Sequence, residues 1–133
     1  METLEPVLSA SQVLALAEAC REVYVHPILE DYIISLVEAT RTSDDLALGA
    51  SPRATLAPYH CSQALAALRG REYIIPDDVQ TLAEPVLAHR LIPSARQRLY
   101  GQAIHGILVN LLATVPVPVE ERWSQDNTWS VTG

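Results

Sequence analysis

Core-facing positions recur at helical spacing in five stretches of this chain. The most regular stretch follows His26-Pro27, and its positions are three and four residues apart: Leu29, Tyr32, Ile33, Leu36, Val37 and Thr40. Such a stripe is typical of a helix with one buried face. Pro27 suits the first helical position, where a backbone N–H would have no partner within the helix.

Two further helices are predicted on either side of this one. The first runs from Ser11 to about Glu22, and its expected buried stripe is Val13, Leu14, Leu16, Ala17 and Cys20. The other starts at Ser51-Pro52-Arg53, with Ser51 as the N-cap, and ends at Gly70. Its expected buried positions are Ala54, Ala57, Cys61, Ala64, Leu65 and Leu68.

The second half of the chain predicts two more helices. One opens at Pro76-Asp77-Asp78, with both carboxylates in the positive first turn, although Ile75 at the capping position has no acceptor. Its stripe is Val79, Leu82, Ala83, Val86 and Leu87. The last helix runs from about Ala95 or Gln97 to Thr114, and its apolar side carries Tyr100, Ile104, Ile107, Leu108 and Leu111.

The segments between these helices predict loops and extended joints. Residues 42–50 begin with polar residues and reach Gly49 near their end, which indicates a loop. Residues 71–75 are expected to be extended and to pair weakly with residues 23–25, and the alternating prolines of residues 115–119 also require an extended chain. The pattern as a whole predicts an all-α fold, a five-helix bundle with short extended joints.

Composition narrows the classes of function. The 133 residues include nine basic residues, all arginine, and carry a net charge of −7. Without lysine, the chain has neither a Schiff-base lysine nor a Walker A phosphate loop. The acidic balance argues against a nucleic-acid partner.

The remaining residue types add no catalytic or metal motif. Four histidines show no zinc-type spacing, so no metal site is expected, and Cys20 and Cys61 are expected to be buried free thiols. No signal peptide and no membrane-spanning run is visible, and a cytoplasmic protein without a membrane partner is expected.

The arginines are unevenly distributed along the chain. Residues 1–50 hold nine acidic residues and two arginines, whereas residues 51–100 hold six arginines and four acidic residues. Arg53 stands out among the six because it lies in the first turn of a predicted helix, where the helix dipole does not favour a cation. An arginine beside free backbone N–H groups is instead a good site for an anion such as phosphate.

Several short motifs resemble, in order and spacing, the C-terminal part of MoxR-type AAA+ ATPases. They are Ala39-Thr40-Arg41, Leu48-Gly49-Ala50-Ser51-Pro52-Arg53-Ala54, Gly70-Arg71-Glu72-Tyr73, Pro76-Asp77-Asp78-Val79, Val86-Leu87-Ala88-His89-Arg90-Leu91 and Val115-Pro116-Val117-Pro118. The resemblance covers residues 4–118. It implies a helical bundle of the AAA+ lid type over residues 1–118 and a polar tail over residues 119–133.

This resemblance implies a role in ATP hydrolysis. In such ATPases a larger N-terminal α/β core domain holds the Walker A and B motifs, sensor 1 and the arginine finger, none of which is present in this sequence. The lid closes over ATP and Mg²⁺ bound to the core and supplies the sensor 2 arginine, which by motif position is Arg53. Arg53 is therefore expected to be both a catalytic and a cofactor-binding residue, while the lid alone is expected to be inactive.

The resemblance also implies partners and a task. It implies ring oligomers, usually hexamers, with chaperone-like remodelling or assembly of other proteins, often beside partners with von Willebrand factor A domains. One alternative is a free-standing helical adaptor for other proteins, which would use residues 115–119, Trp123, Trp129 and the acidic first half. A histone-fold-like DNA binder is disfavoured by the charge.

Overall fold

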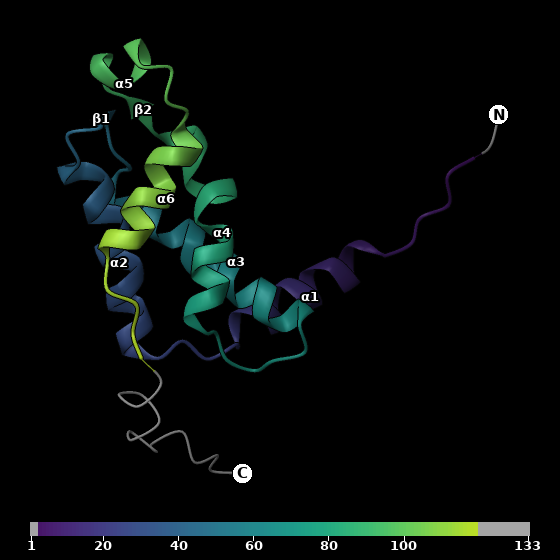
Figure 1. Ribbon diagram of the computed structural model, residues 1–133. Helices are drawn as coiled ribbons and strands as arrows, with labels where there is room; N and C mark the ends of the chain where they lie inside the picture. The colour runs from purple at the N-terminus through teal and green to yellow at the C-terminus, as the bar shows by residue number, and fades with distance from the viewer. Residues whose placement is uncertain (1–2, 120–133) are drawn as a thin grey trace.

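The computed structural model describes residues 3–119, in which six α-helices and two short 3₁₀-helices form an all-α fold. The helices are α1 (Ala10–Arg21), α2 (Pro27–Thr42), α3 (Leu56–Leu68), α4 (Pro76–Leu87), α5 (Ala95–Leu99) and α6 (Ile104–Thr114), with 3₁₀-helices η1 (Pro52–Thr55) and η2 (Ala88–Arg90). Figure 1 shows α2, α3, α4 and α6 gathered in a bundle, from which α1 extends to one side. The tail beyond residue 119, with its two tryptophans, lies outside the described residues.

Helix α2 forms as expected and is central to the core. All six positions of its stripe are buried. Leu29, Tyr32, Ile33 and Leu36 contribute to one hydrophobic cluster, with Val23, Val25, Ala66, Ile74, Val79 and Val115. The next residue of the stripe, Val37, contributes to a second cluster with Leu46, Ala50, Ala54, Leu87, Leu91, Ile107 and Leu108. One helix therefore connects both parts of the core.

The pairing expected between two extended joints is confirmed. Tyr24 and Tyr73 form a parallel bridge, in which the Tyr24 N–H donates to the Glu72 carbonyl at 2.8 Å and the Ile74 N–H donates to the Tyr24 carbonyl at 3.1 Å. Gly70, with a φ of 72°, takes the left-handed conformation just beyond α3, where the sequence predicts the helix end.

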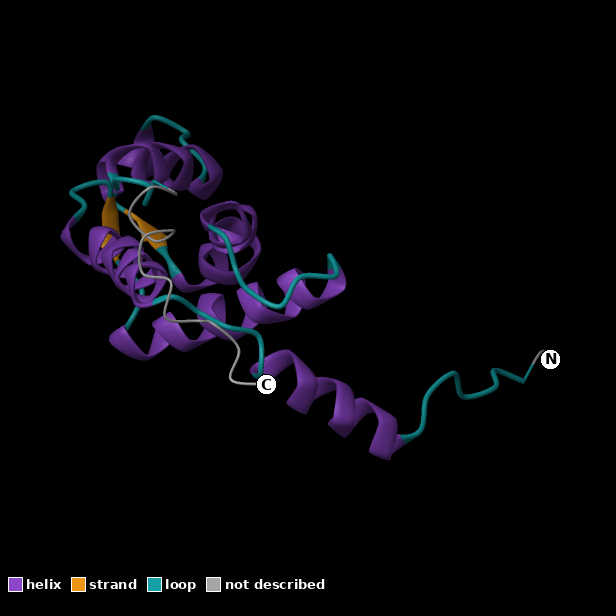
Figure 2. Ribbon diagram, turned by 90° about the horizontal axis from the view of Figure 1, so that it is seen from below, coloured by secondary structure: helices purple, strands orange, loops and turns teal. Residues whose placement is uncertain are grey.

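The prediction of a loop over residues 42–50 is wrong in part. Residues Leu46–Leu48 form strand β1, which pairs antiparallel with β2 (Ile92–Pro93), as Figure 2 shows in orange. A strand this short carries too little alternation to be recognised in sequence, and its pairing depends on a partner more than forty residues away.

The single last helix is also a wrong prediction, so the described chain has six α-helices instead of five. Gly101 adopts a φ of 67° and separates α5 from α6. Tyr100, expected on the apolar side, is exposed.

Three predictions of burial are corrected. Helix α1 forms, capped by Ser9 and Gln12 in a capping box, but none of its residues is buried. In α3 the buried positions are Pro58, Ser62, Gln63 and Ala66, rotated from the expected alanine stripe, and Leu68 is exposed. Alanine lies on several faces of α3, so its spacing defines the buried face poorly. Cys20 is half-buried and Cys61 is exposed, and both are free thiols.

Among the described helices, none is both long enough and apolar enough to cross a lipid bilayer.

Candidate functional site

The end of helix α2 holds the loop that leads to Arg53. The Thr40 hydroxyl is buried, donates to the Val37 carbonyl at 2.6 Å and accepts the Ala50 N–H at 2.9 Å. A buried backbone N–H without a partner is costly, so this bond stabilises one position of the loop against α2. Two of the sequence motifs, one around Thr40 and one around Gly49, therefore meet in space.

Gly49 allows the close approach between this loop and the helix. A Cβ atom at this position would lie 2.4 Å from the Thr40 carbonyl oxygen and 2.6 Å from the Arg41 Cα. Both of these are backbone atoms, which have little freedom to move away. Any larger residue at position 49 would therefore push the loop, and Arg53 after it, away from α2.

Arg53 lies on η1, a short 3₁₀-helix that continues directly into α3. The neighbouring Ala54 is buried in the second core cluster, and its N–H donates to the Ser51 carbonyl at 2.8 Å. Ser51 has the extended conformation expected of an N-cap, but its side chain makes no capping hydrogen bond, which corrects one detail of the prediction. The Arg53 side chain is exposed to solvent.

Arg53 lines a surface depression of about 330 Å³. Its described lining comprises Ser51, Arg53, Leu56, Ala57, His60 and Arg90, so no acidic side chain is among them. His60 Nδ1 lies 3.1 Å from Gln63 Oε1, and Gln63 Nε2 donates to the carbonyls of Arg21 and Val23 at 3.0 and 2.8 Å. Because the Gln63 oxygen can only accept, the proton of this bond is on His60 Nδ1.

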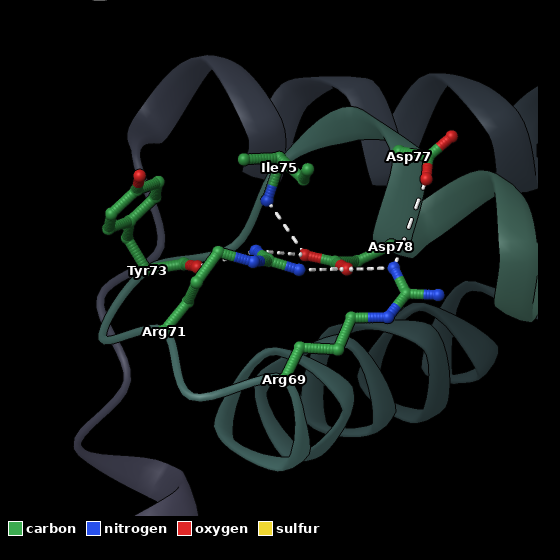
Figure 3. Close-up of polar contacts among 6 residues, drawn as sticks. All are labelled: Arg69, Arg71, Tyr73, Ile75, Asp77 and Asp78. Atoms are coloured by element: carbon green, nitrogen blue, oxygen red, sulfur yellow. Dashed lines mark hydrogen bonds and ion pairs between the residues drawn. The ribbon is translucent and has the colours of Figure 1, made fainter.

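Two other arginines of the same segment are paired with one buried carboxylate. Arg69 Nη1 lies 3.0 Å from Asp78 Oδ1, and Arg71 contacts both carboxylate oxygens at 2.8 and 2.6 Å (Figure 3). The hydrogen bond to Asp78 raises the pKa of Arg71 above its ordinary value. Asp78 also accepts the Ile75 N–H at 2.9 Å. These contacts tie the α3–α4 connection together and engage both guanidinium groups, with Asp77 lying 3.8 Å from Arg69 as a second carboxylate.

Arg53 and Arg90 contrast with that pair. Within the described part of the chain, neither guanidinium has a hydrogen-bond or ion-pair partner. The charge distribution in the sequence identified the arginine-rich segment, and reasoning from the helix start singled out Arg53. Arg90 lies in one of the motifs that resemble the family, but no helix start or other local feature marks it as a phosphate ligand; only the fold brings it to the depression that Arg53 lines.

These residues suit phosphate groups better than a metal ion. Guanidinium groups bind phosphate oxygens through paired N–H donors. Across residues 3–119, no group of three or more His, Cys, Asp or Glu side chains is arranged to hold a metal ion. Any Mg²⁺ that accompanies a nucleotide would need carboxylate or hydroxyl ligands from elsewhere.

Comparison with known proteins identifies the family of this chain. The model of the AAA lid domain family matches residues 38–104. The chain is 34% identical to the Bacillus subtilis protein YeaC over 90% of this chain and 38% of the relative, and 37% identical to the Mycobacterium tuberculosis chaperone MoxR1 over 84% of this chain and 32% of the relative. It also resembles the Paracoccus denitrificans protein MoxR, with 34% identity over 71% of this chain and 32% of the relative.

A solved structure supports the same assignment. The crystal structure of a candidate ATPase from Cytophaga hutchinsonii superimposes with a TM-score of 0.76 and 27% sequence identity, covering 82% of this chain and 36% of that one. The chain thus spans about a third of the length of the relatives that it matches. It belongs to the AAA lid domain family, in the form carried by MoxR-type AAA+ ATPases.

Proposed function

We propose that the chain is the nucleotide-sensing lid of its parent ATPase and that Arg53 is the sensor 2 arginine. In this role the lid closes over ATP bound to an N-terminal core domain, and the Arg53 guanidinium reaches the γ-phosphate. The observation that carries the proposal is an exposed, unpaired arginine whose backbone is held by the buried contact between Thr40 and Ala50.

The chemistry expected of Arg53 is electrostatic. During phosphoryl transfer, negative charge on the transferred group is stabilised by positioned cations. A guanidinium on the lid can supply part of that stabilisation only when the lid is closed, so the lid angle becomes coupled to the nucleotide state. The core domain would supply the phosphate loop and the ligands of Mg²⁺.

The surface of α1 supports a lid that works against other domains. Val13, Leu14 and Leu16 are all more than half exposed, although they form an apolar stripe. In the parent ATPase we place this face against the core domain or a neighbouring subunit. The family resemblance extends this proposal in three ways. It adds assembly into rings, usually hexamers, the remodelling of client proteins, and pairing with von Willebrand factor A proteins.

The test is a substitution at Arg53 in an ATPase that joins this lid to its core domain. We expect Arg53→Ala to lower the turnover of ATP about 100- to 1,000-fold, the size typical of a lost transition-state donor. Arg53→Lys keeps the charge without the paired donors, and its turnover of ATP is expected to lie between those of the unaltered protein and Arg53→Ala. The matched control is Arg96→Ala, which removes an exposed arginine outside the depression. Normal turnover in Arg53→Ala would refute the assignment.

A further inference from the structure

We propose that Arg90 is a second phosphate-binding arginine of the lid, which together with Arg53 forms a two-arginine site for adjacent groups of a polyphosphate chain. The proposal deepens the nucleotide role above and rests on it for naming the ligand as a nucleoside triphosphate. The existence of the anion site itself can be tested without the core domain.

The first support is position. Arg53 and Arg90 are far apart in sequence, on η1 and η2, yet both line the depression of about 330 Å³. Each is adjacent to a buried residue of the same core cluster: Ala54 follows Arg53, and Leu91 follows Arg90. The backbones that carry the two arginines are therefore fixed relative to one another, which reduces the entropy lost when a ligand binds both.

The second support is uncompensated charge. Two cations share one depression whose described lining contains no carboxylate. Elsewhere in the same segment, Arg69 and Arg71 share the buried Asp78 (Figure 3). A bound anion would supply the counter-charge that this lining lacks. The two pairs of arginines therefore differ: Arg69 and Arg71 join helices, whereas Arg53 and Arg90 keep their N–H donors available for a ligand.

The third support is the match to a polyphosphate. Guanidinium groups bind phosphate oxygens bidentately, and two of them suit two neighbouring phosphate groups better than one compact anion. The volume falls within the range of roughly 300–1,000 Å³ found for small-molecule sites. Leu56 and Ala57 add an apolar wall beside the two arginines.

The experiment uses the 133-residue chain and inorganic tripolyphosphate at low ionic strength, where surface charges are least screened. Nuclear magnetic resonance follows the Nε–Hε signals of the arginine side chains during titration. We expect saturable shifts at Arg53 and Arg90 with one dissociation constant. Arg90→Ala and Arg53→Ala are each expected to raise that constant about tenfold, near the lower end for a lost charge-assisted hydrogen bond because both side chains are exposed.

Controls separate a site from a general effect of charge. Arg96→Ala removes the same charge from an exposed arginine outside the depression and is expected to change the constant less than twofold. Arg90→Lys is expected to bind more weakly than the unaltered chain. The proposal is overturned if the binding of tripolyphosphate does not saturate or if the Nε–Hε signal of Arg90 does not shift. It is also overturned if Arg96→Ala weakens binding as much as Arg90→Ala.

The outcomes also distinguish this inference from the proposed function. If both alanine variants lose tripolyphosphate but Arg53→Ala leaves ATP turnover normal, the two-arginine site stands and the sensor assignment fails. If Arg53→Ala lowers turnover while Arg90→Ala affects neither tripolyphosphate binding nor the KM for ATP, the sensor assignment stands and this inference fails.

Discussion

Thr40 is a polar residue on the buried stripe of α2. Its hydroxyl both donates to Val37 and accepts from Ala50, so its burial leaves no hydrogen-bonding group of the side chain unsatisfied. Position 40 was predicted from periodicity alone, because it falls on the buried face. The second partner, ten residues later in the chain, could not be predicted from periodicity and explains why a hydroxyl is present.

We expect Thr40→Val to destabilise the chain by about 1–3 kcal/mol, because the shape is kept while the Ala50 N–H loses its acceptor. Thr40→Ser keeps the hydroxyl and loses one methyl group, which costs about 0.8 kcal/mol. Urea unfolding of both variants measures the difference. A Thr40→Val variant as stable as Thr40→Ser would contradict the role assigned to the hydrogen bond.

At the scale of the elements, Asp78 joins α3, the following loop and α4. The sequence predicted a carboxylate in the first turn of α4, where it offsets the dipole and faces a helix start without a capping side chain. The structure adds the two arginines and the Ile75 N–H as its partners. Arg71 binds with both ends of its guanidinium, whereas Arg69 is partly exposed and contributes less.

The role of Asp78 in this connection is tested by comparing its substitution with that of the adjacent Asp77. Asp78→Asn removes the charge from a carboxylate that is 0% exposed and is expected to cost about 2–4 kcal/mol, below the upper range for buried pairs because its partners reach solvent. Asp77, whose side chain is 72% exposed and 3.8 Å from Arg69, provides the control.

Asp77→Asn is expected to change the free energy of unfolding by less than about 0.5 kcal/mol. Chemical unfolding at neutral pH compares the two variants. Equal effects of the two substitutions would show that first-turn charge, rather than the buried network, is what stabilises this part of the fold.

At the scale of the whole molecule, the two core clusters are continuous through α2, while α1 stands apart from them. Both ribbon views show α1 extending from the bundle (Figure 1, Figure 2). Its apolar stripe has helical spacing like those of the buried helices, yet none of its residues is fully buried in the described chain. The stability of the chain should therefore come from the bundle and very little from α1.

Truncation of one leucine in the bundle and of one leucine in α1 tests whether stability comes mainly from the bundle. Leu29→Ala removes a fully buried side chain and is expected to cost about 2–5 kcal/mol. Leu14→Ala acts on a side chain that is 71% exposed and is expected to change stability by less than about 0.5 kcal/mol. Thermal unfolding of the 133-residue chain measures both. A large loss from Leu14→Ala would mean that the apolar face of α1 packs against the chain in solution.

The sequence by itself determined the all-α class, the buried face of α2, the end of α3 at Gly70, the start of α4 at Pro76 and the pairing of residues 23–25 with residues 71–75. These features follow from a repeat of 3.6 residues, from proline and glycine geometry and from short apolar runs, all of which act over a few neighbouring residues. The motifs around Thr40, Gly49 and Arg53 also indicated the lid family before any contact between them was known.

Only the tertiary structure decided which apolar surfaces are covered and which distant residues meet. Periodicity shows that a helix has an apolar face but not what lies against it, so α1 and a buried helix look alike in sequence. Strands as short as β1 and β2 form only because they pair with one another. Arg53 and Arg90 share one depression because Ala54 and Leu91 pack into the same core cluster, and packing over that distance in the chain has no local sequence signal.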